Sequence, residues 1–294
     1  MESSRIKVLV TGSNGQLGSE IRVISAQHPL LDITFTDVDE LDITDSIAVD
    51  KVIRDLKPNF IINCAAFTAV DRAETEIESA SKLNSIAPGI LAKSCKENGC
   101  KMIHISTDYV FDGTAQTPYT EESPVNPTSE YGLSKLKGDR AVLSSGVGMV
   151  IRTSWLYSSF GANFVKTIIR NGKIKPELRV VCDQVGSPTY ARDFATSILD
   201  IVSLGDKRFI PEIFHYSNEG VCSWYDFACE IIKQAEIDCK VVPIGTIDYP
   251  LPAKRPMYSV FDKSKIRQYY NIEIPNWKDS LENCIKILKT EGFI

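Results

Sequence analysis

The chain has 294 residues, of which 43% are apolar, 24% charged and 9% aromatic, and its formal net charge is -5. These fractions are those of a globular protein and exclude disordered, collagenous and coiled-coil chains. The acidic balance argues against a general nucleic-acid binder, which usually carries a basic stripe. No apolar run approaches the roughly 20 residues of a membrane span. Met1 to Arg5 leads straight into Ile6–Val10, without the longer apolar region of a secretory leader. We therefore expect a cytoplasmic protein without nucleic-acid or membrane partners.

Neither the cysteines nor the histidines have the spacing of a metal centre. The eight cysteines include no C-x-x-C pair, and the three histidines lie far apart in the sequence. We expect free thiols, several of them buried, and no zinc site.

The first half of the chain alternates short apolar strands with helical patterns. The strands are expected at Ile6–Val10, Asp32–Asp37, Phe60–Cys64, Met102–Ser106 and Val150–Thr153. The helices are expected at Gln16–Ala26, Ile47–Leu56, Glu76–Glu97 (interrupted near Pro88) and Tyr131–Leu143. This alternation predicts an α/β fold, a Rossmann-type doubly wound parallel sheet with right-handed crossovers.

The second half is less regular. Helices are expected at Phe164–Arg170, Phe194–Ser203, Trp224–Ala235 and Trp277–Leu288, short strands at Val180–Cys182 and Phe214–Tyr216, and a long ordered loop at Pro243–Pro256. We predict a dinucleotide-binding domain in residues 1–155, which also receives residues 183–209. Residues 156–294 would mainly form a smaller C-terminal α/β lobe that binds the substrate.

A glycine-rich turn follows the first strand. Thr11 to Gly18 has a G-x-x-G-x-x-G spacing, a variant of the dinucleotide fingerprint. Glycines let the backbone approach a pyrophosphate closely, and the free N–H groups of the following helix bind the anion. A plain glycine turn is the alternative, but the position between strand and helix favours a cofactor site. The expected cofactor contacts here are Gly12, Asn14, Gly15, Gln16, Leu17 and Gly18.

Further cofactor contacts are expected at the ends of the next strands. Asp37 ends the second strand, where a carboxylate accepts hydrogen bonds from the adenosine ribose and normally favours NAD over NADP. A solvated turn residue is the alternative for this position. Asp42 and Ile43 are candidates to flank the adenine edge. Ala65 and Ala66, after the third strand, leave room for a cofactor, although small residues there also suit tight packing.

A tyrosine and a lysine lie four residues apart in an expected helix. Tyr131 and Lys135 therefore share one helix face, and Thr107 ends the fourth strand at the sheet edge where such folds bind ligands. An ammonium about 5 Å from a phenol, at an effective dielectric of about 20, contributes roughly 3 kcal/mol, or about two pKa units. These residue types suit carbonyl reduction, in which the phenol gives up a proton near pH 7. A packed tyrosine with a solvated lysine is the alternative.

Together, the glycine loop, Thr107, Tyr131 and Lys135 resemble the extended short-chain dehydrogenase/reductase superfamily. Within it, several stretches are similar to the dTDP-4-dehydrorhamnose reductases. They are Gly15–Gly18, Ala65–Glu74, Ser106–Phe111, Arg152–Tyr157, Asp183–Thr189 and, towards the C-terminus, Arg255-Pro256.

The resemblance implies reduction of the C4 keto group of a dTDP-4-dehydro-6-deoxy-L-sugar by NADPH or NADH, the last step of dTDP-rhamnose synthesis for polysaccharides. Tyr131 would donate the proton, Lys135 would bind the nicotinamide ribose and lower the tyrosine pKa, and Thr107 would steady the reacting oxygen. Implied substrate contacts are Val70, Thr107, Asp108, Tyr109, Trp155 and Arg255. Arg255 is suited to pair with the substrate pyrophosphate, and Trp155 has a competing core role.

Two features depart from the family pattern or leave it open. Some members bind magnesium at a dimer interface through acidic side chains. Glu20 matches one of these, but Arg192 stands where another carboxylate is expected, so no metal ligand is predicted and a homodimer stays a candidate. The family often uses NADPH despite an acidic residue after the second strand, so Asp37 does not decide the coenzyme.

Two other functions compete with the reductase. A nucleotide-sugar 4,6-dehydratase would have Asp-Glu after the threonine, whereas Asp108 is followed by Tyr109 here; an epimerase stays open. A non-catalytic regulatory subunit, resembling that of methionine adenosyltransferase, is disfavoured by the intact Tyr131, Lys135 and Thr107 set.

Overall fold

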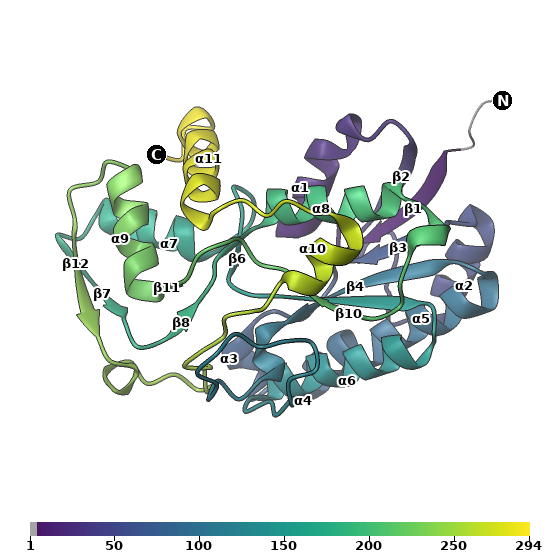
Figure 1. The fold of residues 1–294 in the computed structure, drawn as a ribbon, viewed down its shortest axis with the longest axis horizontal. Helices are drawn as coiled ribbons and strands as arrows, with labels where there is room; N and C mark the ends of the chain where they lie inside the picture. Colours follow the sequence, from purple (N-terminus) through teal and green to yellow (C-terminus); the bar gives the residue numbers. More distant parts are fainter. Residues whose placement is uncertain (1–4) are drawn as a thin grey trace.

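The computed structural model describes residues 5–294, and in that range six parallel strands form the central sheet, in the order β10-β5-β4-β3-β1-β2 (Figure 1). The predicted start without a leader falls partly on residues 1–4, which lie outside the described residues. The strands are β1 (Ile6–Thr11), β2 (Leu31–Thr36), β3 (Phe60–Asn63), β4 (Lys101–Thr107), β5 (Gly148–Thr153) and β10 (Ile213–His215). The strand order reverses between β1 and β3, and ligands of such sheets bind outside the carboxyl ends of the strands at this point.

Helices cover both faces of the sheet (Figure 1). One face carries α1 (Gln16–Ile24) and α8 (Ala191–Ser203), and the other carries α2 (Ser46–Leu56), α5 (Ala87–Asn98) and α6 (Glu130–Ser144). Along β1, Val8 and Val10 pack in the core beneath α1 and α8, whereas Leu9 packs in the core beneath α2 and α5. Because both faces of the inner strands are buried, β1 and β3 read as nearly continuous apolar runs in the sequence.

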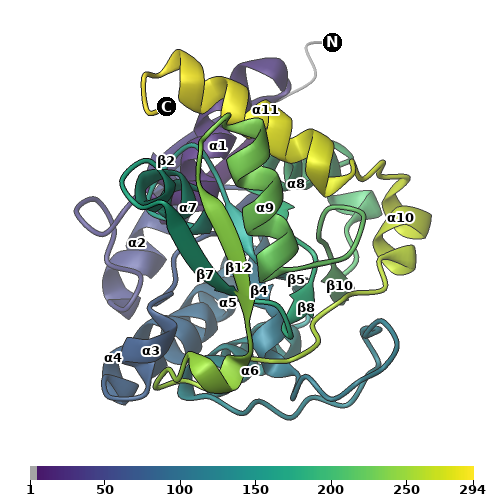
Figure 2. The ribbon, with the colours of Figure 1, turned by 90° about the vertical axis from the view of Figure 1, so that its left-hand side faces the viewer.

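A second apolar core lies beside the sheet, on the side that faces the viewer in Figure 2. There β7 (Glu177–Val181) pairs in parallel with β12 (Lys240–Ile244). The helices α7 (Phe164–Gly172) and α9 (Trp224–Gln234) pack on this pair, and α11 (Trp277–Thr290) packs on α9 in the same core. The smaller lobe is thus built almost entirely from the second half of the chain.

Short elements connect these layers. Two-residue strands pair as β6 (Leu156–Tyr157) with β9 (Thr189–Tyr190) and β8 (Val185–Gly186) with β11 (Cys222–Ser223). The short helices are α3 (Val70–Ala73), α4 (Ile77–Ser81), the π-helical turn η2 (Lys82–Ile86) and α10 (Ser264–Tyr270). The 3-10 turns are η1 (Ser25–Gln27), η3 (Asp108–Val110), η4 (Asp206–Arg208) and η5 (Thr246–Asp248).

The predicted doubly wound parallel sheet is confirmed, and the structure corrects details of the prediction. The loop expected from Pro243 begins too early, because Pro243 lies inside β12. This strand belongs to a two-stranded sheet, where an edge position tolerates a missing N–H. The helix expected over Glu76–Glu97 is divided by the π-helical turn, and Pro88 lies in the first turn of α5, where proline is tolerated. β10 joins the large sheet although it lies far beyond residue 155; the division into two domains stays a prediction.

Candidate active site

The glycine loop between β1 and α1 is packed so closely that side chains are excluded. Gly12 has a φ of +66°, and a Cβ there would lie 2.5 Å from the backbone nitrogen of Ala65. A Cβ at Gly18 would lie 2.5 Å from the Cα of Ser13. No side chain caps the first turn of α1 after Gly15, so its N–H groups stay available to an anion. The loop therefore has the form that a phosphate-binding turn needs.

Asp37 lies directly beside this loop. Its carboxylate accepts the backbone N–H of Asn14 over 2.8 Å and that of Val38 over 2.8 Å. The Asp42 carboxylate is occupied by Thr44, which lowers the pKa of Asp42 through two hydrogen bonds. Ile43 is buried in the core beneath α2 and α5. Asp37 is thus placed at the loop, and contacts of Asp42 and Ile43 with an adenine stay predictions.

Tyr131 lies in the first turn of α6, against the end of β4. Ser129 caps this helix by accepting the N–H of Gly132. Gly132 packs so tightly on the carbonyl oxygen of Tyr109 that no side chain fits between them. The rings of Tyr109 and Tyr131 therefore meet edge to face, with centroids 5.4 Å apart and planes at 80°.

Burial and neighbouring groups determine how the catalytic candidates titrate. Burial raises the pKa of the Tyr131 phenol, and a hydrogen bond with Thr107 acts in the opposite direction. Burial lowers the pKa of Lys135 to about 8. Thr107 Oγ1 donates to Asp108 Oδ1 over 3.0 Å and accepts the N–H of Tyr109 over 3.2 Å. Thr107 thus hydrogen-bonds the Tyr131 phenol, and Lys135 lies one helical turn along α6 from Tyr131.

Lys135 rests on buried polar groups that sequence reasoning missed. Its Nζ donates to the carbonyl oxygen of Ile105 over 2.6 Å and lies 3.4 Å from His104 Nε2. His104 in turn contacts Asn63 over 3.1 Å. The available signal was a histidine between two isoleucines in β4 and an asparagine at the end of the apolar strand β3.

The expected substrate residues divide into two groups. Val70 begins α3 and is followed by Asp71, whose carboxylate accepts hydrogen bonds from both terminal nitrogens of Arg255 over 2.9 and 2.7 Å. Trp155 lies two residues after the end of β5 and has a left-handed φ of 49°. Its ring stacks on that of Trp224 at a centroid distance of 3.6 Å. Arg255 therefore already holds a carboxylate, and the ring of Trp155 has a packing partner.

The carboxylate of Glu20, a candidate metal ligand, is already bound by two protein groups. Its buried carboxylate accepts Arg192 Nε over 2.7 Å and the hydroxyl of Ser158 over 2.6 Å. Within the described part of the chain, no three histidine, cysteine, aspartate or glutamate side chains gather as a metal site.

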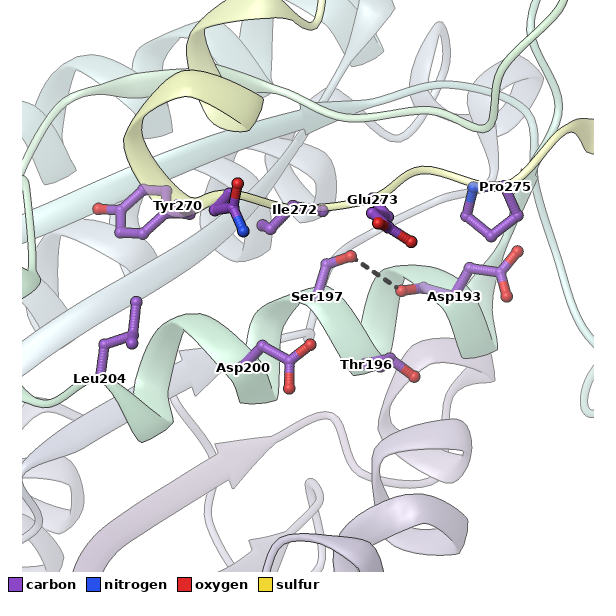
Figure 3. A pocket seen from close by; sticks show the side chains of 10 residues that line it. Asp193, Thr196, Ser197, Asp200, Leu204, Tyr270, Ile272, Glu273 and Pro275 are labelled. Atoms are coloured by element: carbon purple, nitrogen blue, oxygen red, sulfur yellow. Dashed lines mark hydrogen bonds between the residues drawn. The ribbon is translucent and has the colours of Figure 1, made fainter.

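A cavity of about 430 Å³ lies away from these residues, between α8 and the segment Tyr270–Pro275 (Figure 3). It contains none of the predicted site residues, and its walls carry the carboxylates of Asp193, Asp200 and Glu273. Three carboxylates would repel a nucleotide diphosphate, so this cavity does not suit the predicted ligands.

Known proteins are similar to this chain over nearly its full length. The family model described as "RmlD substrate binding domain" matches residues 6–290. The dTDP-4-dehydrorhamnose reductase of Aggregatibacter actinomycetemcomitans is 39% identical over 290 residues, covering 94% of this chain and 97% of that protein. The chain belongs to the dTDP-4-dehydrorhamnose reductase family. The resemblance predicted from the motifs is therefore confirmed.

Solved structures of this family have the same fold. A dTDP-4-dehydrorhamnose reductase from Clostridium acetobutylicum has a TM-score of 0.91 and 44% identity, covering 96% of this chain and 99% of that chain. The enzyme from Bacillus anthracis, in complex with NADP, has a TM-score of 0.90 and 38% identity, covering 96% and 99%. Across residues 5–294, none of the helices combines the length and apolarity that crossing a bilayer requires.

Proposed function

We propose that the protein reduces the C4 keto group of dTDP-4-dehydro-6-deoxy-L-mannose to give dTDP-L-rhamnose, with Tyr131 as the proton donor. The observation that carries the proposal is the hydrogen bond between Tyr131 and Thr107 at the carboxyl end of β4, with Lys135 one helical turn further along α6, on the edge of the sheet that holds the glycine loop. The relatives named dTDP-4-dehydrorhamnose reductase over nearly the full length support it.

The reaction needs one proton on the oxygen that forms at C4. A bound reduced nicotinamide supplies the hydride. The Tyr131 hydroxyl gives its proton to the oxygen, and the Thr107 hydroxyl, which already faces the phenol, hydrogen-bonds the same oxygen. The tyrosinate that remains is stabilised by the ammonium of Lys135, one helical turn away. Because the site is buried, this charge attraction is stronger than it would be in water.

We propose NADPH as the preferred coenzyme, supported by the NADP found in the Bacillus anthracis relative. The open first turn of α1 would hold the pyrophosphate, and Ala65 and Ala66 would leave room for the cofactor beside it. Asp37 is placed to accept from the adenosine ribose, although its carboxylate already binds Asn14 and Val38. No metal ion is part of this proposal.

Arg255 is the proposed contact for the diphosphate of the substrate. Asp71 and the carbonyl oxygen of Ala253 take three of its five N–H donors. The remaining donors, Nε–H and one N–H of the second terminal nitrogen, stay available in a fixed orientation. A guanidinium held in this way binds phosphate oxygens with little loss of side-chain freedom. We propose Val70, Asp108, Tyr109 and Trp155 as the walls of the sugar site.

Turnover tests the proposal directly. The protein is mixed with NADPH and freshly made dTDP-4-dehydro-6-deoxy-L-mannose, and the loss of nicotinamide absorbance is followed. We expect stoichiometric oxidation of NADPH with dTDP-L-rhamnose as the product, identified by chromatography against a standard. No turnover with either NADPH or NADH would refute the function. The cytoplasmic location and the homodimer stay predictions from the sequence.

A further inference from the structure

Three buried polar side chains lie beneath Lys135 and link neighbouring strands of the central sheet. They are Thr11 at the end of β1, Asn63 at the end of β3 and His104 in β4. Burying such groups costs free energy unless their hydrogen bonds are satisfied. Their hydrogen bonds determine where the proton of the histidine lies.

The amide of Asn63 can face only one way. The backbone N–H of Ala65 donates to Asn63 Oδ1 over 3.2 Å, and the Thr11 hydroxyl donates to the same oxygen over 2.8 Å. A backbone N–H is always a donor, so Oδ1 has to face Ala65. The amide nitrogen Nδ2 then faces His104 Nδ1, 3.1 Å away. An amide NH₂ group only donates, and therefore His104 Nδ1 is the acceptor.

The tautomer of His104 follows from this bond. Burial holds the pKa of His104 well below its ordinary value, so the ring carries a single proton. With Nδ1 accepting, that proton lies on Nε2, 3.4 Å from Lys135 Nζ. If Lys135 is an ammonium, its N–H groups face the N–H of His104 Nε2 and no hydrogen bond forms. If Lys135 is an amine, its lone pair accepts the hydrogen bond from His104 Nε2.

We propose that His104, held by Asn63 as the Nε2–H tautomer, donates to the amine form of Lys135. His104 is thereby a positioning residue that sets the charge of this lysine. The inference rests on the proposed function, in which Lys135 serves Tyr131. The amine has two N–H groups: one donates to the carbonyl oxygen of Ile105 over 2.6 Å, and the other is left for the cofactor side.

Other groups packed around Lys135 also act on its pKa. Burial lowers it, while Asp139 on α6 acts in the opposite direction, as a thiolate at Cys64 after β3 would. The thiol of Cys64 is neutral at physiological pH because burial raises its pKa to about 12. The phenol of Tyr131 is also neutral there, because burial raises its pKa. The His104 N–H acts in the same direction as burial, since it stabilises the amine. Removing that N–H should therefore raise the pKa of Lys135.

Nitrogen-15 NMR of the whole protein tests the tautomer without any turnover. The chain has three histidines, and the variants His28→Gln and His215→Gln assign the other two rings. Near neutral pH we expect a protonated Nε2 and an unprotonated Nδ1 at His104. A proton on Nδ1 would overturn the proposal. This result is independent of the substrate, so it separates a failure of the inference from a failure of the proposed function.

The pH dependence of kcat/KM tests the consequence for Lys135. The proposed reaction needs the ammonium, so activity falls as the pH rises through the pKa of Lys135. In His104→Phe the donor is gone, and the loss of one hydrogen bond should move this alkaline limb up by about one pH unit. His28→Gln, far from the site, should leave the limb where it is.

A second variant keeps the imidazole and reverses its tautomer. In Asn63→Asp a carboxylate faces Nδ1 and forces the proton onto that nitrogen, so Nε2 becomes an acceptor for the ammonium. The alkaline limb should again move to higher pH, and the NMR spectrum should show the proton on Nδ1. An alkaline limb that coincides with the wild type in both variants would refute a role of His104 in the charge of Lys135.

Discussion

Replacing Tyr131 by phenylalanine removes one hydroxyl group from the candidate active site and leaves the ring. The ring packs edge to face on Tyr109, a contact that phenylalanine retains. General acid catalysis contributes about 10²–10⁴-fold to a rate, which corresponds to about 3–5 kcal/mol of activation free energy. The Thr107 hydroxyl can still bind the developing oxyanion but cannot replace a phenol as the acid. We therefore expect kcat to fall by at least about two orders of magnitude.

The assay measures the initial rate of NADPH oxidation at saturating nucleotide-sugar, and the cofactor Kd by fluorescence. The Kd and the thermal unfolding midpoint should stay close to the wild type, because the hydroxyl does not support the fold. Tyr269→Phe, at an exposed position outside the site, serves as the matched control. Turnover of Tyr131→Phe within tenfold of the wild type would show that the proton comes from another group.

Three further predictions concern neighbouring carboxylates. Asp71→Asn leaves one acceptor oxygen for the guanidinium of Arg255, which is then held less firmly. Because the pair is partly exposed, we expect the KM for the nucleotide-sugar to rise by about five- to tenfold. An unchanged KM in steady-state kinetics would contradict the diphosphate contact. Asp37→Ala should weaken NADH more than NADPH in Kd measurements, and equal losses would mean that the carboxylate does not touch the ribose. Burial raises the pKa of Asp108 from 3.8 to about 6, so the folded state holds this proton more tightly than the unfolded chain. Stability should fall as the pH rises from about 4 to about 7, by up to about 3 kcal/mol. Asp108→Asn should flatten this fall in urea unfolding curves; a slope equal to the wild type would exclude Asp108 as its cause.

Local sequence patterns were sufficient to predict most of the sheet and the glycine turn after its first strand. The run Ile6–Val10 is apolar at each position but Lys7 because helices bury both faces of β1. Gly12 and Gly18 are required where backbone meets backbone. The four-residue spacing of Tyr131 and Lys135 indicates a shared helix face wherever the helix lies.

The features that the sequence did not reveal depend on distant partners. β12 is short, contains Pro243 and, within the described residues, pairs only with β7, so its sequence reads as the start of a proline-rich loop. Arg255 and Asp71 are 184 residues apart, and nothing local indicates that they pair. Likewise, a histidine in a buried strand does not show which side chain faces it.

Trp155 combines two local requirements that conflict. Its left-handed backbone would suit glycine, and an L-residue there costs roughly 1–2 kcal/mol. The ring nevertheless lies flat on Trp224, with the backbone of Gly186 against its edge. If stability alone mattered, glycine, which has no Cβ, would relieve this backbone strain. Strain of this kind persists where a side chain serves another purpose. The torsion angle therefore supports the proposal that the indole forms part of the sugar site.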